Sequence, residues 1–281
     1  MKVGSYVSTI KNQKSPLKFL IARILMRIHL SKLFVIKLKN YKLRFYPTPF
    51  LASLWIDPDR DHTANVFFGD YLKEGDKVID IGANIGAVTL ESATKIKEPG
   101  IIYSIEPHPR IYKYLVGNIK LNNLTNVHAY NIALGKENGT SFLTDIKSDD
   151  QNSITDNGGI KVVVKRLDDL KFSCNYFDLI ILDSIGYEKF ILEGGQKILS
   201  KTKCVHFPVI ERFFEDYGYA YSEIFQLFKN AGFDLYTFRA KTISLVPKDY
   251  VPQENAELSD ILAIRDLPDF IKRTGYTLNK N

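Results

Sequence analysis

From residue 75 onward, short apolar runs alternate with segments of helical length, and this alternation constrains the fold more than any other feature. The apolar runs predict strands at residues 76–81, 100–107, 126–134, 176–183 and 203–211. The intervening segments predict helices at residues 84–96, 110–123, 187–199 and 220–232. Strands that alternate with helices of this length form a parallel sheet covered on both faces. The pattern therefore predicts an α/β, Rossmann-like fold.

Two further segments extend this pattern. Residues 135–168 contain the apolar runs GTSFL and GIKVVVKRL, which predict extra strands around a polar loop at 144–159. That loop is polar enough to serve as a lid over a site. Apolar runs at 233–240 and 260–265 predict two last strands. With the five strands above, they predict a mostly parallel, seven-stranded sheet.

Residues 1–70 are predicted to form an N-terminal extension, and residues 71–281 the main domain. The extension contains a basic amphipathic helix at 19–30, a β-hairpin at 34–46 and a helical segment at 59–72. Arg23 and Arg27 interrupt the apolar helix one turn apart. Such a helix packs its apolar face on its own domain or lies on a membrane, which would place peripheral membrane contact in residues 15–45. We expect the packing arrangement.

The composition is that of a soluble globular protein with a basic balance. The net charge is +6 and the pI about 9.0, which permits nucleic acid, a membrane surface or an acidic glycan as a partner. No segment reaches the roughly 20 apolar residues of a spanning helix. Cys174 and Cys204 form no CxxC pair, so no metal site is expected. We expect a cytoplasmic protein, with peripheral membrane attachment as the alternative.

A glycine-rich turn follows the first predicted strand and indicates a nucleoside-containing ligand. Asp80, Gly82 and Gly86 give the pattern D-x-G-x-x-x-G, with Asn84 where a dinucleotide site needs its middle glycine. A side chain at that position crowds a pyrophosphate but not an amino-acid group. Glu106 ends the second strand, where a carboxylate can accept hydrogen bonds from both ribose hydroxyls. S-adenosylmethionine fits this combination, and a nicotinamide cofactor does not.

At this point the sequence resembles a known family. The stretch VIDIGANIG and the later SIEPHPRIYKYLVGNIKLNN are similar to the cofactor-binding half of class I methyltransferases, and more narrowly to the FkbM family. The matching positions are residues 80–86, 106–109, Asn118 and Asn122, Leu167 and Asp168, Asp183, Gly186, Glu188 and Glu211. The resemblance covers roughly residues 65–240. It implies a class I methyltransferase fold and S-adenosylmethionine as cofactor.

Each candidate cofactor residue has a predicted role. Asp80 is expected to face the methionine amino group, and Gly82 and Gly86 to keep Cβ atoms out of the cofactor's path. Glu106 is expected to accept hydrogen bonds from the ribose. The other candidates for cofactor binding are Ala83, Asn84, His108, Asn131, Ala133 and Asp183. Of these, Asn131 and Ala133 are placed near the adenine edge, and His108 packs on the adenosine or acts as a base.

The candidates for a catalytic base are Asp183, Glu188 and Glu211, with His108 as a further choice. Methyl transfer to a hydroxyl requires a base within hydrogen-bond reach of that hydroxyl. The family usually has Glu and Lys where this chain has Ile185 and Ile181, so the identity of the base stays open. His206 lies in an apolar run and is predicted to be a core residue. The aromatic run at 213–221 forms either a substrate wall or a hydrophobic brace.

The leading hypothesis is O-methylation of a hydroxyl on a sugar, a glycan or another small metabolite. The first alternative is RNA methylation, in particular of tRNA, because residues 11–44 are rich in Lys and Arg. Against it, the segment after the fourth strand lacks the N-P-P-[YF] motif of amino-methylating nucleic-acid enzymes. The second alternative is a non-catalytic or membrane-associated module on the same fold.

Overall fold

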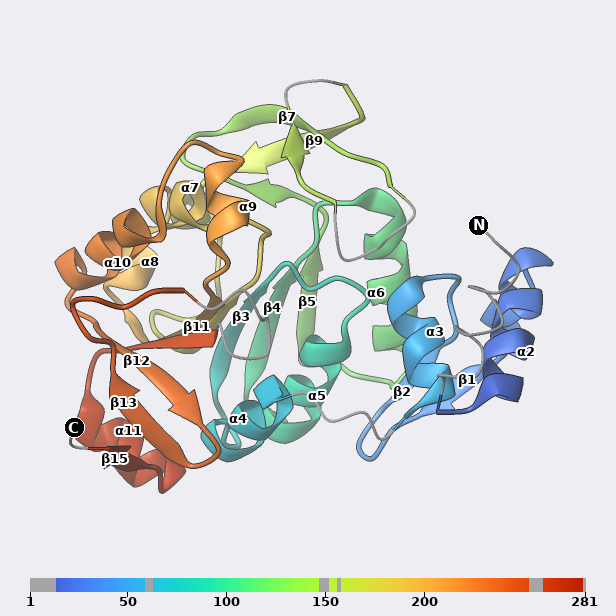
Figure 1. Ribbon diagram of the computed structural model, residues 1–281, viewed down its shortest axis with the longest axis horizontal. Coiled ribbons are helices and arrows are strands. Elements are labelled where there is room, and N and C mark those ends of the chain that lie inside the picture. The colour runs from blue at the N-terminus through green and yellow to red at the C-terminus, as the bar shows by residue number, and fades with distance from the viewer. Residues whose placement is uncertain (1–13, 59–62, 147–151, 156–157, 253–259, 280–281) are drawn as a thin grey trace.

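The computed structural model describes residues 14–58, 63–146, 152–155, 158–252 and 260–279. Its main sheet has nine strands in the order β15-β13-β12-β14-β11-β10-β3-β4-β5 (Figure 1). Five neighbouring strands run parallel, namely β11 (Thr202–Pro208), β10 (Phe177–Leu182), β3 (Lys77–Ile81), β4 (Ile101–Ile105) and β5 (Val127–Tyr130). This arrangement confirms the predicted Rossmann-like fold.

The other half of the sheet is mixed in direction. Strand β14 (Asp260–Ile264) inserts antiparallel between β11 and β12 (Asp234–Arg239). Two more strands, β13 (Thr242–Leu245) and β15 (Thr277–Asn279), extend the edge beyond β12. The predicted count of seven strands is therefore two short. Both missed strands are short and contain polar residues, so neither has the apolar pattern of a buried strand.

A second sheet has the order β6-β9-β7-β8. Its strands are β6 (Ala133–Leu134), β7 (Gly139–Leu143), β8 (Ile154–Thr155) and β9 (Ile160–Lys165). The single strand predicted at 126–134 is wrong, because the chain leaves β5 after Tyr130 and enters the second sheet at Ala133. The predicted polar loop at 144–159 falls partly outside the described residues.

Helices cover both faces of the main sheet. One face carries α4 (Thr63–Tyr71), α5 (Ala87–Ile96) and α11 (Leu267–Thr274), and α6 (Pro109–Leu121) lies beside β5 (Figure 1). The other carries α7 (Glu188–Glu193), α8 (Gln196–Leu199) and α10 (Tyr221–Asn230), with α9 (Glu211–Glu215) before α10. The helix predicted at 187–199 is divided at Gly194 and Gly195. Asp168, in the 3-10 turn η2 (Leu167–Asp169), accepts hydrogen bonds from the first turn of α8.

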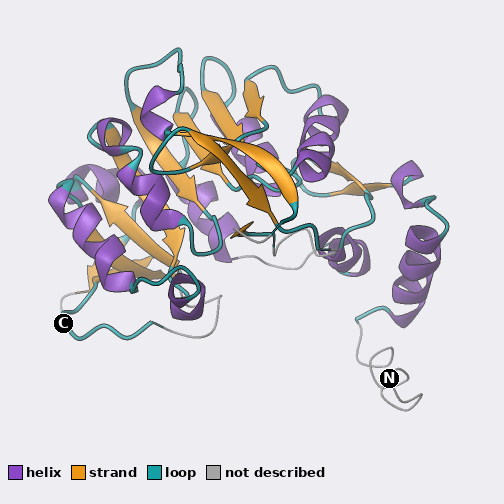
Figure 2. Cartoon of the chain, turned by 90° about the horizontal axis from the view of Figure 1, so that it is seen from above, coloured by secondary structure: helices purple, strands orange, loops and turns teal. Residues whose placement is uncertain are grey.

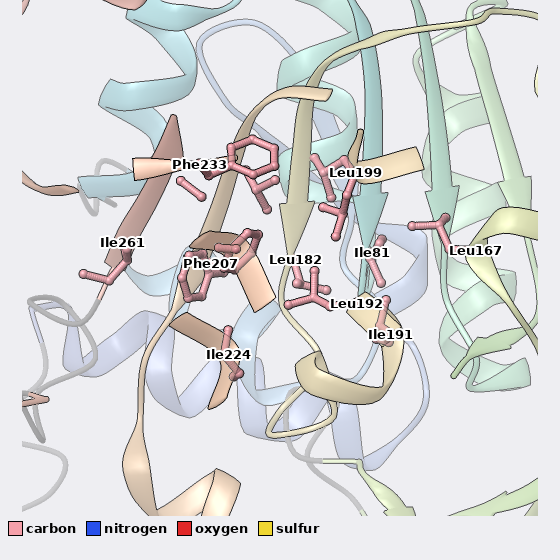
Figure 3. Close-up of a cluster of buried hydrophobic side chains, with 14 of the residues drawn as sticks. Ile81, Leu167, Leu182, Ile191, Leu192, Leu199, Phe207, Ile224, Phe233 and Ile261 are labelled. Atoms are coloured by element: carbon pink, nitrogen blue, oxygen red, sulfur yellow. The ribbon is translucent and has the colours of Figure 1, made fainter. Parts of the chain in front are cut away.

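The core consists of apolar layers on the two faces of the sheet. Every residue of β10 is buried, as expected for a strand covered on both sides. Ile180 and Leu182 point into the layer beneath α7 and α10, while Leu179 and Ile181 point into the opposite layer. Figure 3 shows the first layer, where Leu182 and Phe207 of neighbouring strands meet Ile191 of α7 and Ile224 of α10.

The N-terminal extension packs on α6 and shares a core with it. It contains α2 (Pro16–Arg27), the 3-10 turn η1 (Ser31–Leu33), the hairpin β1 (Val35–Lys37) and β2 (Lys42–Arg44), and α3 (Pro49–Ile56). Leu43, Phe45 and Leu51 are buried in one cluster with Leu115 and Ile119 of α6. The boundary at residue 70 stays a prediction, but the two parts share buried side chains.

Helix α3 was missed by the sequence analysis although it carries a start signal. Thr48 accepts a hydrogen bond from the Leu51 N–H, and Pro49 occupies the first helical position. Pro47 and Pro49 also fit the end of the preceding hairpin, so the sequence pattern does not predict this helix.

Asn118 in α6 and Asn122 just after it join the hairpin to the main domain. The Asn118 amide donates to the Ile85 carbonyl at 2.8 Å and accepts from the Arg44 N–H at 2.9 Å. Asn122 accepts from the Lys42 N–H and donates to the Lys42 carbonyl. The spaced asparagines of the family motif therefore have a structural role here.

Replacing Asn118 with alanine is expected to destabilise the fold by about 1–3 kcal/mol, because it leaves buried backbone groups of Ile85 and Arg44 without partners. Urea denaturation of the full chain measures this change. The matched control is Asn230→Ala at the exposed end of α10, which is expected to change the free energy of unfolding by less than about 0.5 kcal/mol. Equal effects of the two substitutions would contradict the assignment.

The apolar face of α2 does not pack on the domain as expected. Only Ala22 is buried in this helix, whereas Leu17 is 69% exposed and Ile24 is 59% exposed. The prediction that this face is covered by the protein's own domain is therefore wrong. None of the helices within the described ranges is long and apolar enough to cross a membrane.

Candidate functional site

The glycine-rich turn lies at the carboxyl end of β3, beside the ends of β4 and β10. The N–H groups of Gly82 and Ala83 both donate to the Ile105 carbonyl at 3.0 Å. Gly82 has a φ of 83°, and a Cβ there would overlap the backbone carbonyl oxygen of Asp183. The glycine is therefore required by the close crossing of two loops of this chain. That it also clears the cofactor's path stays a prediction.

The remainder of the turn is held by local contacts. Asn84 has a left-handed φ of 50°, and its side-chain oxygen accepts a hydrogen bond from the Ile85 N–H at 2.7 Å. Asparagine tolerates this conformation better than most residues. At Gly86, a Cβ would lie 2.6 Å from a methyl group of Leu115 in α6. Gly86 thus permits close packing between the turn and α6, and Ala83 is buried in the same cluster.

Glu106 follows β4 and is fixed by the backbone on both sides. One carboxylate oxygen accepts from the Asn84 N–H at 2.9 Å, and the other accepts from the His108 N–H at 2.8 Å. The side chain is 7% exposed. Since a carboxylate can accept about four hydrogen bonds, Glu106 can also accept hydrogen bonds from a ligand. Its position depends on the loops after β3 and β4.

A cleft opens beside Glu106 at the carboxyl edge of the sheet. Of the predicted cofactor residues, six line this cleft: Gly82, Asn84, Glu106, His108, Ala133 and Asp183. Ile132 and Ile154 add apolar walls, the latter from the second sheet. The carboxyl-edge position is the one expected for ligands of open α/β sheets.

Asp80 lies behind the turn and is not among the described lining residues of the cleft. Its carboxylate accepts a hydrogen bond from the Thr89 hydroxyl, which also lies 3.0 Å from the Ser104 hydroxyl. Burial raises the pKa of Asp80 to about 7, with a smaller contribution from the nearby charge of Asp183, while the Thr89 hydrogen bond opposes the shift. Asp80 therefore braces the first turn of α5 against β4.

Asn131 and His108 support the loop that carries Glu106. The Asn131 amide donates to the carbonyls of Glu106 and Pro107 at 2.8 and 2.9 Å. His108 precedes α6 and accepts from the Arg110 N–H through Nδ1, which leaves Nε2 to donate to Asp145 at 3.2 Å. Burial lowers the pKa of His108, although Asp145 opposes this shift. A neutral imidazole therefore faces the cleft.

A second cavity lies beside the first, and Asp183 and Ile185 line both. Asp183 follows β10 and is exposed. Ile185 has a left-handed φ of 51°, an unusual conformation for a β-branched residue. Ile181 also lines the second cavity. Both positions where the family usually has Glu and Lys therefore face this cavity with apolar side chains.

Glu188 begins α7 and is the buried acid of the second cavity. It is 1% exposed, and one carboxylate oxygen accepts from the Ser184 N–H at 2.9 Å. The other oxygen has no hydrogen-bond partner among the described residues. Burial raises the pKa of Glu188 to about 7, opposed by backbone hydrogen bonds and reinforced by Asp183. Such a carboxyl is poised to exchange a proton near neutral pH.

Because the folded-state pKa of Glu188 is raised, Glu188 favours folding below about pH 4.5 and loses this contribution as the pH rises to about 7. Glu188→Gln removes this titration. Relative to the parent, the variant is expected to gain up to about 3 kcal/mol of stability between pH 4.5 and pH 8. Urea denaturation of both proteins at the two pH values measures the gain. An unchanged difference between variant and parent would contradict a buried, protonated Glu188.

His206 is both a core residue, as predicted, and a lining residue of the second cavity. It is 5% exposed and stacks on Phe67 with ring centroids 5.6 Å apart, as predicted for a core residue. It also lines the second cavity, where its Nε2 lies 3.4 Å from an Asp260 carboxylate oxygen. Asp260 is brought there by β14, which pairs antiparallel with β11. No local signal in the sequence indicates this pairing.

Glu211 lies apart from the described lining of both cavities. Strand β11 ends at Pro208, so the expectation that Glu211 closes this strand is wrong. Glu211 begins α9, and its carboxylate accepts from the Tyr221 N–H at 3.3 Å, at the start of α10. Burial raises the pKa of Glu211. The contacts place it as a helix-terminus acid.

The aromatic run at 213–221 lines the second cavity and contacts neighbouring loops, while its role as a substrate wall stays a prediction. Phe213 and Phe214 line the second cavity. The Tyr217 hydroxyl donates to the Ile154 carbonyl of the second sheet at 2.9 Å, and the Tyr219 hydroxyl donates to the Gly186 carbonyl.

Within the described residues, no group of three or more His, Cys, Asp or Glu side chains is arranged to hold a metal ion.

The solved structures similar to this one include the precorrin-6y C5,15-methyltransferase of Geobacter metallireducens, with 16% identity, a TM-score of 0.44 and coverage of 73% of this chain and 87% of that chain. Another is Aeropyrum pernix fibrillarin in complex with natively bound S-adenosyl-L-methionine, with 15% identity, a TM-score of 0.42 and coverage of 73% and 75%.

A curated protein matches over a short segment. The tRNA(Phe) (4-demethylwyosine(37)-C(7)) aminocarboxypropyltransferase of Methanocaldococcus jannaschii is 46% identical over 54 residues, which are 19% of this chain and 21% of that enzyme. This chain therefore spans about a fifth of the length of the curated relative it matches. The model of the methyltransferase FkbM domain matches residues 80–235, which is more than half of the chain. The protein belongs to the FkbM methyltransferase family.

Proposed function

We propose that the protein is an S-adenosylmethionine-dependent methyltransferase that methylates a hydroxyl of a sugar, a glycan or another small metabolite. The observation that carries this proposal is the pair of adjoining cavities. One contains the fixed carboxylate of Glu106, the other contains the buried acid Glu188, and Asp183 and Ile185 line both. A donor in the first cavity and an acceptor in the second would meet beside Asp183.

The residues of the first cleft fit an adenosine-type ligand. Glu106 can accept hydrogen bonds from two neighbouring ribose hydroxyls, because its carboxylate is held in place by two backbone N–H groups. Ile132 and Ala133 offer an apolar edge for a purine, and the turn at Gly82 and Asn84 also lines the cleft. When bound, the cofactor supplies an activated methyl group for an in-line displacement.

The second cavity provides a place for the acceptor and its proton. Methylation of a hydroxyl releases a proton, which a base near the acceptor oxygen can take up. Glu188 is the best candidate, because one oxygen lacks a hydrogen-bond partner among the described residues and its pKa is raised to about 7. Asp183 and the pair of His206 and Asp260 face the same cavity. Phe213 and Phe214 give it the aromatic walls that suit the face of a sugar ring.

Mass spectrometry of a cell extract incubated with the protein and S-adenosylmethionine labelled in the methyl group tests this proposal. One class of hydroxyl-bearing small molecule or glycan is expected to gain the label. Glu188→Gln is expected to bind the cofactor like the parent and to lose transfer of the label. Labelling of a nitrogen atom, or no labelling by a protein that binds the cofactor, would overturn the proposed reaction.

The 54-residue similarity to a tRNA-modifying enzyme favours RNA as a second candidate acceptor. Under this alternative, label would appear in the tRNA fraction of the same extract. Binding of tRNA would also weaken steeply with salt, because phosphate contacts release counterions. Absence of label from nucleic acid, with label in a small molecule, would exclude this candidate.

A further inference from the structure

The charge of this chain is divided unevenly along its length. Of the 38 Lys and Arg residues, 11 lie in residues 1–56, and those residues contain no Asp or Glu. The remaining 27 basic residues are outnumbered by the 32 acidic residues, all of which lie after residue 56. Residues 1–56 therefore carry the whole positive balance, and the rest of the chain is slightly acidic. Such an asymmetry indicates that the extension meets an anionic partner.

The same extension also exposes an apolar surface. Fifteen large hydrophobic side chains are exposed among the described residues, and eight of them lie between residues 17 and 34. These are Leu17, Leu20, Ile21, Ile24, Ile28, Leu30, Leu33 and Phe34, which we call the apolar stripe. Each of the first five lies three or four residues from another of them along α2 and its end, so they share one side of the helix. Clustered exposure of this kind indicates a binding surface.

Basic residues border the apolar stripe on both sides. By the helical period, Lys18 lies on one border, and Arg23 and Arg27 lie on the other. All three side chains are exposed. Arg23 and Arg27 also line a groove between α2 and α3, so an anionic group beside the helix would meet two guanidinium groups. The side of α2 opposite the stripe carries Ala22 and Met26, which pack on the extension.

The position of α2 leaves the apolar stripe accessible. Figure 1 places α2 at the edge of the molecule, with α3 between it and α6. In Figure 2 the same helix lies at the edge of the molecule, away from the main sheet. A flat surface can therefore approach α2 without a collision with the main sheet or its helices.

We propose that α2 and η1 dock the protein on an anionic membrane surface. The apolar stripe would enter the boundary between headgroups and acyl chains, while Lys18, Arg23 and Arg27 meet lipid phosphates on both sides. An apolar face with basic borders is the pattern of a helix that lies in the membrane interface. RNA does not explain the pattern, because phosphate contacts do not require five exposed aliphatic side chains on one face. A second copy of the chain would bring the same basic borders together.

Flotation of the full chain with lipid vesicles tests this proposal, and it needs neither cofactor nor acceptor. The vesicles contain phosphatidylcholine alone or phosphatidylcholine with a quarter of phosphatidylglycerol. The parent is expected to bind the anionic vesicles at least tenfold more tightly than the neutral ones. The double variant Ile24→Asp, Ile28→Asp is expected to lose at least tenfold in affinity for anionic vesicles. Arg23→Gln with Arg27→Gln is expected to reduce the preference for anionic lipid.

The control is Leu245→Asp. Leu245 is 58% exposed on β13, which lies at the opposite end of the main sheet from β5 and the extension. This variant is expected to bind vesicles like the parent. Three results would overturn the proposal: no binding to either vesicle, equal binding by the α2 variant and the parent, or a dimer in sedimentation that the α2 variant abolishes. The surface would be reassigned to RNA if tRNA displaced the protein from vesicles when tRNA phosphate and anionic lipid are present at equal concentration. The α2 variant would then also lose tRNA binding.

Discussion

Glu106→Gln is expected to weaken S-adenosylmethionine binding by at least about 100-fold. The two carboxylate oxygens of Glu106 accept hydrogen bonds from the backbone N–H groups of Asn84 and His108. A glutamine would turn its NH₂ group toward one of these donors, so the side chain and a loop must move. The displaced side chain then loses the two proposed hydrogen bonds from the ribose hydroxyls to the carboxylate. Two hydrogen bonds to a charged group contribute about 3 kcal/mol or more, which corresponds to at least about 100-fold in Kd. Isothermal titration calorimetry with S-adenosylmethionine measures the change.

The control for this substitution is Glu137→Gln, an exposed acid before β7. It makes the same chemical change away from the cleft and is expected to leave the Kd within about threefold of the parent. Circular dichroism establishes that both variants are folded, so that lost binding reports on the site. A Glu106→Gln variant that is folded and binds like the parent would show that the cofactor lies elsewhere.

Gly82→Ala is expected to lower the free energy of unfolding by several kcal/mol. The residue has a φ of 83°, and a Cβ would overlap the Asp183 carbonyl oxygen, which belongs to the backbone after β10. Relief requires that the loop after β3 or the loop after β10 moves. Overpacking and backbone strain each cost about 1–3 kcal/mol at buried positions. Urea denaturation of the full chain measures the total.

Substitutions at two other glycines separate the backbone strain from the contact with Asp183 in the destabilisation expected for Gly82→Ala. Gly75 has a φ of 88° with open space around a Cβ, so Gly75→Ala reports the backbone strain alone, about 1 kcal/mol. Gly69 lies in α4, also with open space and without a positive φ, so Gly69→Ala is expected to stabilise the helix by about 0.5–1 kcal/mol. If Gly82→Ala costs no more than Gly75→Ala, the contact with Asp183 is not what requires the glycine.

The sequence predicts the central sheet well because its strands are buried on both faces. A strand such as β10 has no polar face, so it is recognised as a continuous apolar run. The same reasoning fails where a strand is short or changes sheets. The chain leaves β5 after Tyr130 because Asn131 turns to bind the Glu106 and Pro107 carbonyls, and a run of apolar letters does not encode that contact.

In the candidate site, too, some residues can be placed from the sequence and others cannot. Gly82, Asn84, Glu106 and Asp183 follow three neighbouring strands, so the topology alone brings them to one edge and around one cleft. Residues whose position depends on long-range pairing are harder to predict. The contact between His206 and Asp260 exists because β14 inserts between β11 and β12, more than 50 residues after β11 in the chain. The environment of Glu188 likewise depends on helices and loops that pack from several directions.

Helix α6 has a consequence for engineering. It begins beside His108, which lines the cleft, and its other end holds the hairpin through Asn118 and Asn122. A helix of 13 residues is about 20 Å long and behaves as one rigid rod. A chimaera that exchanges the extension between relatives must therefore carry matching side chains on α6 as well. The unit to exchange therefore extends into the main domain, beyond residue 122.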